Sequence, residues 1–386
     1  MNMPRTVWVL GLVSLLMDLS SELVHSLLPV FMTTVLGAGM LAVGIVEGIA
    51  EATASVLKAF SGALSDRMKR RKPLVVLGYG LAALSKPLFP LAGAVALVLG
   101  ARVMDRIGKG IRGAPRDALI ADVTPDALRG RAYGLRQGLD TVGAVLGPLA
   151  AVGLMLAFAS DVRTVLWFAA VPAALSVVVL VLFVREAERA APATGSPSLN
   201  FGSLKKFKFQ YWAIVALGAV LTLARFSEAF LILRAQELGV ALAMLPVVLV
   251  VMNVVYTAFA YPAGVAADRG HRKALLVWGL AALIASDLLL ARDSLPLLAA
   301  GVVLWGAHMG LTQGLLSMLV ASAAPAELRG TAFGVFHLVS GVALLAASVL
   351  AGWLWSAFGA AWTFYAGALF TAVALVGMLL VTKGRQ

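Results

Sequence analysis

The sequence predicts an all-α membrane protein whose twelve transmembrane helices form two pseudo-symmetric six-helix halves. Three observations predict this fold: an apolar composition, a series of long apolar runs, and motifs that recur about 200 residues apart. Of the 386 residues, 61% are hydrophobic and 13% are charged, and the mean hydropathy is +0.94. Soluble proteins are about 45–50% apolar and about 25% charged. Lipid is therefore expected to surround most of the chain.

Two motifs of the first half return in the second half in the same order. Residues 125–134 read Pro-Asp-Ala-Leu-Arg-Gly-Arg-Ala-Tyr-Gly, and residues 325–334 read Pro-Ala-Glu-Leu-Arg-Gly-Thr-Ala-Phe-Gly. Residues 62–67 read Gly-Ala-Leu-Ser-Asp-Arg and return at 264–269 as Gly-Val-Ala-Ala-Asp-Arg, an offset of 264 − 62 = 202. In so apolar a chain, this duplication predicts two structurally equivalent halves with a substrate site between them.

The predicted halves are residues 1–185 and 211–386, joined by a cytoplasmic linker at 186–210. The linker contains Pro, Gly and Ser, which build no packed core, so we expect it to be partly flexible. Its basic end at 205–208 is suited to contact with anionic lipid headgroups. A plain solvated linker explains the same composition.

The individual spans follow from helix length. A helix crossing the roughly 30 Å hydrocarbon core needs about 20 residues. Apolar runs between charged residues or Pro/Gly breaks predict, in chain order, spans at 7–36, 40–65, 73–92, 94–113, 130–158, 162–184, 211–235, 242–267, 273–291, 296–321, 328–357 and 361–382. The third and fourth spans are only weakly separated, by residues 90–94.

The loops between these spans predict the orientation of the chain. Loops 36–40, 90–94 and 358–361 carry no Lys or Arg. Basic residues instead follow the even-numbered spans and end the chain, among them Lys69, Arg116, Arg129, Arg131, Arg185, Arg272, Lys383 and Arg385. Because cytoplasmic loops carry the excess of Lys and Arg, both termini are expected in the cytoplasm. The predicted location is the inner (cytoplasmic) membrane, with the chain crossing it many times.

The repeated loop motif is a candidate conformational gate. Its glycine permits close helix approach, and its charged residues can hold neighbouring helix ends in one state and release them in another. The gate candidates are Gly62, Asp66, Arg67 and Arg70 with Gly264, Asp268 and Arg269 in the repeat. Gly143, Gly147 and Pro148 join them, because the glycines lie one turn apart and the proline weakens the helix. The alternatives are positive-inside charge for the loops and tight packing for the glycines.

These features resemble the major facilitator superfamily over essentially the whole chain. Residues 62–72 resemble that family's signature loop, motif A. Arg106, Lys109 and Gly110 resemble its R-x-x-Q-G pattern of span four, with lysine where glutamine is usual. Residues 143–148 resemble the start of G-x-x-x-G-P-x-x-G-G, the span-five pattern of antiporters, whose closing glycine pair is absent here. The resemblance implies a transporter fold, a span-four arginine linked to proton handling or to substrate anchoring, and antiport.

Charged side chains at membrane depth are the remaining signal. Such groups are costly in lipid and are expected to face a cavity or a partner. Asp18 and Glu22 lie one turn apart, so their charges repel and the pair is expected to hold a proton near neutral pH. The proton-coupling candidates are Asp18, Glu22, Glu47, Glu51 and Asp140. The candidates for lining a substrate cavity are His25, Lys58, Lys86, Arg102, Arg106, Arg136, Gln137, Arg225, Glu228, Asn253, Tyr256, His308 and Gln313.

Each of these candidates also has a structural interpretation. Arg136 and Asp140 have the spacing of an ion pair within one helix, and Glu47 with Lys58 can neutralise each other. His25 can form a hydrogen bond inside the bundle, and Arg102 and Arg106 can extend to the membrane surface. The polar groups concentrate in the first half. That distribution predicts that the first half carries the coupling and that the second half is a more passive wall.

The predicted function is secondary active transport by alternating access, with proton-coupled antiport that exports a small amphipathic molecule. The partners expected are a small-molecule substrate, protons and the lipid bilayer, without nucleic acid, and the protein is expected to be a monomer. An alternative substrate is an anionic solute such as an organic acid, a phosphate ester or a metal chelate. A more distant alternative is a non-transporting membrane sensor. No Walker motif, cysteine or paired histidines occur, so no enzyme activity, cofactor or metal site is predicted.

Overall fold

The computed structural model describes residues 3–66, 68, 70–186, 207–324 and 328–383. In these ranges every regular element is a helix, and none is a β-strand. Most of the predicted linker, Arg67 of the gate, and residues 325–327 of the repeat lie outside the described residues. The surroundings of Gly62 and the side chain of Asp66 are likewise outside the description, although the backbone of both residues belongs to a helix.

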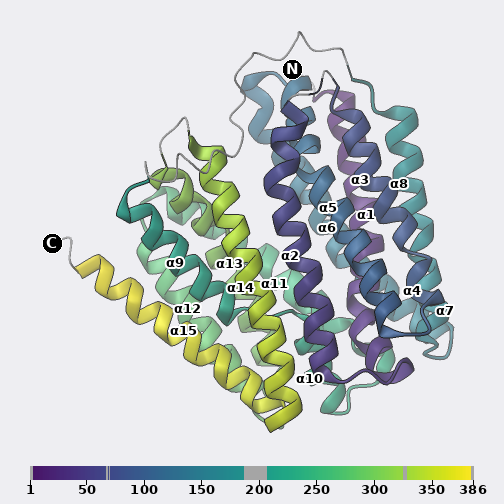
Figure 1. Cartoon of the computed structure of the whole chain (residues 1–386), viewed down its shortest axis with the longest axis vertical. Helices are drawn as coiled ribbons and strands as arrows, with labels where there is room; N and C mark the ends of the chain where they lie inside the picture. Colours follow the sequence, from purple (N-terminus) through teal and green to yellow (C-terminus); the bar gives the residue numbers. More distant parts are fainter. Residues whose placement is uncertain (1–2, 67, 69, 187–206, 325–327, 384–386) are drawn as a thin grey trace. The chain divides into compact units, whose positions relative to one another are not determined.

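The helices that precede the linker account for the first six predicted spans (Figure 1). Three of these spans are single helices and three consist of two shorter pieces that follow each other closely. In chain order they are α1 (Arg5–Val30) with the π-helical turn η1 (Phe31–Val35), α2 (Met40–Asp66), α3 (Lys72–Ser85) with α4 (Leu88–Leu91), α5 (Val95–Val123), the 3₁₀ turn η2 (Asp126–Leu128), α6 (Arg129–Ala157), and α7 (Val162–Phe168) with α8 (Ala170–Phe183).

The helices after the linker follow the remaining predicted spans. They are α9 (Phe209–Ala224), α10 (Ala229–Glu237), the 3₁₀ turn η4 (Leu242–Met244), α11 (Val247–Asp268), α12 (Arg272–Leu290), α13 (Leu295–Ala323), α14 (Arg329–Phe358) and α15 (Ala360–Lys383). The sequence predicted one continuous helix over 211–235. The structure divides it into α9 and α10, because residues 225–228 are not helical.

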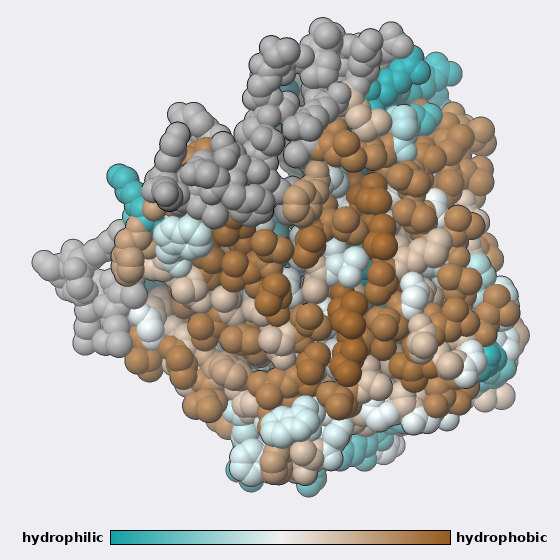
Figure 2. Space-filling model, viewed as in Figure 1, coloured by the Kyte–Doolittle hydropathy of each residue, from teal (hydrophilic) through white to brown (hydrophobic). Residues whose placement is uncertain are grey.

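Among the described residues, 11 helical segments are long and apolar enough to cross a membrane. The predicted span 94–113 is not among them, because α5 carries many charged residues from Arg102 onward, including Asp105, Arg106 and Lys109. Apolar residues dominate the helices on the face seen in Figure 2. The protein is therefore a multi-pass membrane protein, and twelve crossings stay a prediction.

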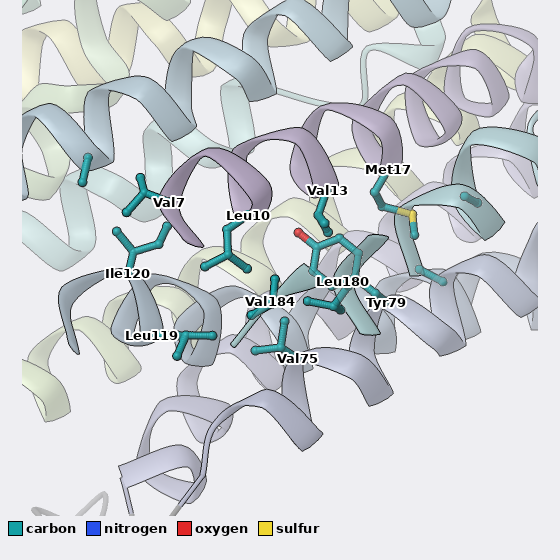
Figure 3. Packing of buried hydrophobic residues seen from close by; sticks show 13 residues of the cluster. Val7, Leu10, Val13, Met17, Val75, Tyr79, Leu119, Ile120, Leu180 and Val184 are labelled. Carbon is teal, nitrogen blue, oxygen red and sulfur yellow. The ribbon is translucent and has the colours of Figure 1, made fainter. Parts of the chain in front are cut away.

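The helices pack as two units. The first unit comprises Met1–Leu36 and Ile49–Leu199, and the second comprises Gly37–Gly48 and Asn200–Gln386. In the first unit, α1 packs against α6 and α8, and α3 packs against α5 and α8. Its apolar core is drawn in Figure 3, where Val7, Leu10 and Met17 of α1 meet residues of α3, α5 and α8.

The second unit has an equivalent arrangement in which α13 packs against α11 and α12, and α15 packs against α9 and α12. One contact shows how closely the units correspond. A Cβ on Gly110 of α5 would lie 2.6 Å from the Leu57 Cβ and 3.1 Å from the Ala54 carbonyl oxygen of α2. A Cβ on Gly310 of α13 would lie 2.7 Å from the Phe259 Cβ and 2.8 Å from the Tyr256 carbonyl oxygen of α11. The same atoms meet at nearly the same offsets, 310 − 110 = 200 and 256 − 54 = 202.

Candidate functional site

The carboxylates Asp18 and Glu22 lie where α1 crosses α6. A Cβ on Gly143 of α6 would lie 2.6 Å from the Leu15 carbonyl oxygen and 3.1 Å from the Asp18 Cβ. A Cβ on Gly147 would lie 2.8 Å from the Glu22 Cβ. We call this contact the α1–α6 seam, defined by Leu15, Asp18 and Glu22 against Gly143 and Gly147. The two glycines bring the backbones together and so fix the position of both carboxylates.

The two seam carboxylates differ in their partners. Glu22 lies 3.4 Å from the Nδ1 atom of His25, one turn further along α1. Asp18 has neither a hydrogen bond nor an ion pair in the described part of the chain. The charges acting on Asp18 are those of Asp140, Lys109 and the α5 arginines. Of the two seam acids, Asp18 is therefore the one without a direct hydrogen-bonding or ionic partner among the described residues.

A buried chain of polar contacts links four helical segments beside the seam. The Lys86 Nζ, at the end of α3, donates to the Asp105 Oδ1 of α5 at 2.7 Å and to the Ser21 Oγ of α1 at 3.0 Å. Arg106 lies 3.6 Å from Asp105 and 2.9 Å from the Glu51 Oε1 of α2. The side chains of Lys86, Asp105 and Arg106 are 1–3% exposed. These buried charges are tolerated because each lies beside a group of opposite charge.

A second polar cluster joins α5 to α6. Arg136 and Asp140 form an ion pair at 2.5 Å across one helical turn, as the structural interpretation of the sequence predicted. Arg136 also donates to Gln137 and lies 3.7 Å from the Asp117 carboxylate. Arg116 lies 4.0 Å from the Asp140 Oδ1 and 3.2 Å from Asp117. Asp140 thus lies beside two arginines, Arg136 at ion-pair distance and Arg116 further away.

Lys109 is a site residue that the sequence candidates omitted. It lies on α5, is exposed, and has no hydrogen bond or ion pair in the described part of the chain. Its charge acts on Asp18, Glu22 and Glu51 together. The signal that identifies it is the run of charged residues three or four apart along α5, which places them on one helix face. That run is Arg102, Asp105, Arg106, Lys109, Arg112 and Arg116.

Glu47 and Lys58, both on α2, belong to different units, and each is described within its own unit. Glu47 is 1% exposed, groups with the second unit, and accepts a long hydrogen bond of 3.4 Å from the Ser227 Oγ. Lys58 is exposed in the first unit, and the acidic charge that acts on it is that of Asp117. Arg102, another predicted cavity residue, is buried in α5 and is 1% exposed.

Four predicted cavity residues of the second unit lie near one another. The charge of Arg225, in the gap between α9 and α10, acts on Glu228, Tyr256 and His308. The Nδ1 atom of His308 lies 2.8 Å from the Gly279 carbonyl oxygen, so this buried ring is held by the backbone of α12. Two further candidates, Asn253 of α11 and Gln313 of α13, are half-buried.

The gate candidates are only partly described. Arg70 is exposed beside α3, and Gly264, Asp268 and Arg269 are exposed at the end of α11. Pro148 is buried inside α6 next to the seam. The neighbouring Arg71 has a defined role: its guanidinium donates to Asp122 of α5 at 2.9 Å and to Ser65 of α2 at 2.6 Å. The α2–α3 loop is thereby joined to the end of α5.

The sequence comparisons define the class of protein to which this fold and polar network belong. The family model described as Major Facilitator Superfamily matches residues 10–233 and 214–386. An uncharacterized MFS-type transporter of Methanocaldococcus jannaschii is 33% identical over 368 residues, covering 92% of this chain and 89% of the relative. The chain therefore belongs to the major facilitator superfamily, a family of transporters.

Two further similarities are more limited. The multidrug resistance protein MdtH of Proteus mirabilis is 30% identical over 157 residues, covering 41% of this chain and 38% of that protein. A crystal structure of a POT family transporter in complex with a thioalcohol conjugated peptide has a TM-score of 0.81 at 13% identity, covering 99% of this chain and 97% of that one. The structural likeness shows a shared fold.

Proposed function

We propose that this secondary transporter works by alternating access and couples the export of a small amphipathic molecule to proton entry. The main observation behind this proposal is the setting of Asp18. This acid lies in the α1–α6 seam, has no direct partner among the described residues, and is acted on by the charges of α5. Such a group gains or loses a proton with little rearrangement of its own contacts. Because an intramembrane charge is costly, its protonation state favours one arrangement of its surroundings over another.

The proposed cycle assigns different work to the two seam acids. Asp18 accepts a proton on its carboxylate and becomes neutral, and substrate binding from the other side of the membrane displaces that proton to water. Glu22 stays charged beside His25 and supplies a fixed negative charge. The motion is assigned to two halves, residues 1–185 and 211–386, with the gate residues holding the loops. We place both termini in the cytoplasm, in keeping with the positive-inside rule, and the protein in the inner membrane.

The export direction rests on two supports. The seam glycines Gly143 and Gly147 with Pro148 resemble the antiporter pattern in sequence and lie against the proposed proton site in space. The partial similarity to MdtH, whose name describes multidrug resistance, covers 41% of this chain. Together these favour an amphipathic compound leaving the cell.

Proton flux in proteoliposomes tests the coupling. We expect Asp18→Asn to abolish substrate-induced proton movement, because the amide cannot exchange a proton, and Glu22→Gln to weaken it by removing the fixed charge. Asp126→Asn is the matched control, since Asp126 is 85% exposed in η2. Proton movement that is unchanged in both seam variants removes these acids from the mechanism.

A second candidate function, transport of an anionic solute, is favoured by Lys109. Its ammonium group is exposed and has no ion pair in the described residues, and the Nη1 atom of Arg112 is buried without a hydrogen-bond partner among them. Two cationic groups with spare donors on α5 suit a carboxylate or a phosphate. Lys109→Gln separates the two functions when cationic dyes and carboxylates are compared in one transport assay. Selective loss of carboxylate transport supports the anionic substrate, whereas unchanged carboxylate transport with impaired dye export excludes it.

A further inference from the structure

Asp287 of α12 is a fully buried acid whose charge is not neutralised by any described residue. Its exposure is 0%, and neither carboxyl oxygen has a hydrogen-bond partner in the described part of the chain. The residues one turn away on α12, Leu283 and Leu290, are apolar and fully buried. Polar groups at this depth are normally satisfied, so the exception calls for a physical explanation.

The surroundings of Asp287 are aromatic and tightly packed. A Cβ on Gly367 of α15 would lie 2.7 Å from the Asp287 Oδ2 and 3.1 Å from the Phe226 ring. Phe226 in turn packs against Trp305 and Phe364, at centroid distances of 5.4 and 5.5 Å. An ionised carboxylate in such a setting is strongly disfavoured, whereas a neutral acid is tolerated.

The titratable groups on the elements around Asp287 do not supply a counter-charge. His308 of α13 contacts the Gly279 backbone, and Arg225 acts on Glu228 and Tyr256. Tyr211 of α9 donates to the Ala332 carbonyl oxygen. Asp268 of α11 and Tyr365 of α15 are exposed, and Asp287 forms no hydrogen bond with any described group. The space beside the carboxyl group is too small even for a methyl group on Gly367. A proton bound to the carboxyl group needs almost no additional volume, so it is the cation that fits.

A break in the neighbouring span lies directly beside the acid. Residues 225–228 separate α9 from α10, and Phe226 of this break is the residue that packs next to the carboxyl near Gly367. Broken helices within transporters are the points at which ions bind and backbone conformation changes.

We propose that Asp287 is a proton-binding site of the second half, loaded in this structure and discharged when the break between α9 and α10 rearranges. On discharge the carboxyl O–H bond breaks, its electron pair stays on the carboxylate, and the proton passes to water. Reloading reverses the step, so no other reactant is needed. This inference rests on the proposed proton-coupled transport, and it replaces the expectation that the second half is a passive wall.

The position of Asp287 in the repeat supports a specialised role. Gly78 of α3 packs against α5 just as Gly279 of α12 packs against α13, an offset of 279 − 78 = 201. The same offset, 287 − 86 = 201, relates Asp287 to Lys86. Lys86 is neutralised by Asp105, 2.7 Å away. At the equivalent place in the second half an acid stands where the first half has a base, and no described residue pairs with it.

Infrared spectroscopy of the full chain in lipid tests loading without requiring any transport. A protonated carboxyl has a carbonyl stretch distinct from that of a carboxylate. We expect a carboxylic acid band at neutral pH that is lost in Asp287→Asn and kept in Asp293→Asn, whose side chain is 88% exposed. We also expect Asp287→Asn to fold with unchanged thermal stability, since the amide replaces a neutral acid. An unchanged acid band in folded Asp287→Asn overturns the proposal.

Proton counting tests discharge. In proteoliposomes, substrate-induced proton release is expected to show two ionisations in its pH profile, and Asp287→Asn is expected to lose one of them while Asp293→Asn keeps both. If the acid band is confirmed but the profile of Asp287→Asn matches the wild type, the proton is permanent and the coupling role is wrong. If Asp18→Asn loses all proton movement while Asp287→Asn keeps the wild-type acid band and pH profile, this inference fails and the proposed function stands. If Asp18→Asn and Glu22→Gln both keep wild-type proton movement, the proposed function fails whatever the Asp287 band shows.

Discussion

Lys86 and Asp105 illustrate how a charge is accommodated inside the first unit. Their side chains are 1% and 3% exposed and 2.7 Å apart, and Lys86 has a second acceptor in Ser21. The desolvation of each ion is offset by the other and by the added hydrogen bond. The pair therefore behaves as one unit, and removing either member leaves the other unsatisfied.

The stability of single and double variants tests this dependence. We expect Asp105→Asn to lower the free energy of unfolding by about 3–5 kcal/mol, because Lys86 stays buried without its anion. Lys86→Met combined with Asp105→Leu is expected to recover most of that loss. Thermal unfolding in detergent, with Asp126→Asn as the exposed control, measures both effects. A double variant less stable than Asp105→Asn contradicts the argument.

The sequence predicted the contacts of some site residues and not of others. The spacing of Arg136 and Asp140 was sufficient to predict their ion pair, because both partners lie on one helix. Asp105, the partner of Lys86, and Glu51, the second partner of Arg106, lie on other helices than the residues they pair with. The rotation of each helix about its axis is not encoded in a local pattern. Lys109 and Asp287 were missed as site residues for the same reason, since their importance depends on which contacts the folded chain leaves them.

Among the elements, α1 and α6 depend most clearly on small residues. Gly147 faces the α1 backbone, whereas a Cβ on Gly153 of the same helix would meet no described atom within 4 Å. We expect Gly147→Ala to cost about 1–3 kcal/mol through overpacking and Gly153→Ala to be neutral or to stabilise by up to about 1 kcal/mol. Thermal unfolding compares the two variants. If both variants are equally stable, the α1–α6 seam accommodates a methyl group on Gly147 without loss of stability.

The ends of α3 and α8 cap each other. Glu186 accepts the backbone N–H groups of Arg71 and Lys72 at 2.6 and 2.8 Å, at the start of α3. The Lys72 Nζ donates to the carbonyl oxygens of Val181 and Val184, at the end of α8. Each side chain thus satisfies helix-terminal groups of the other helix and complements its dipole.

Hydrogen exchange at these helix ends tests the reciprocal capping. Glu186→Ala and Lys72→Met are each expected to cost about 1 kcal/mol, and to speed amide exchange in the first turn of α3. Glu237→Ala, at the partly exposed end of α10, is the control. Because the two caps join the same helix ends, the double variant should lose less than the sum of the single losses. If the stability losses of the two single variants add up fully in the double variant, the two caps act independently.

The turn before α7 supplies a pH-dependent cap. Asp161 accepts from the Thr164 hydroxyl and from the backbone N–H groups of Arg163 and Thr164. The Thr164 hydrogen bond, more than any other cause, holds the pKa of Asp161 below its usual value. A lowered folded-state pKa stabilises the protein above the unfolded pKa, and that stability is lost as the pH falls through the folded value.

Acid titration of stability tests the cap. We expect Asp161→Ala to cost no more than about 1 kcal/mol at neutral pH, because the site is exposed. The wild type should lose this advantage below roughly pH 4, the ordinary aspartate range, so the two unfolding curves converge in acid. Thermal midpoints measured across this range give the difference. A difference that persists at low pH assigns the effect to packing.

For the whole molecule, the packing equivalence of Gly110 and Gly310 makes a symmetric prediction. We expect Gly110→Leu and Gly310→Leu to destabilise the protein similarly, by about 1–3 kcal/mol or more, since each side chain meets the same backbone atoms of the next helix. Gly113→Leu is the control in α5, where a Cβ would meet no described atom within 4 Å. Sensitivity at only one of the two glycines would show that the halves have diverged in packing.

At this scale the sequence was most informative. Apolar run length located the helices, and the repeat located equivalent positions, because both depend on composition over many residues. The break at residues 225–228 was not predicted, since it contains neither Gly nor Pro and its apolar neighbours continue on both sides. In the structure Phe226 of the break packs against Trp305 and Phe364, which are distant in sequence, and no local pattern shows these contacts.

The opposite charges at Lys86 and Asp287 also bear on ancestry. If the halves arose from one duplicated gene, at least one of these positions has changed its residue since the copy was made. A chain built from two first halves would carry the Lys86–Asp105 pair twice and would lack the Asp287 acid, and one built from two second halves would carry that acid twice. The halves are therefore not interchangeable at this position, although Gly110 and Gly310 make alike contacts in both.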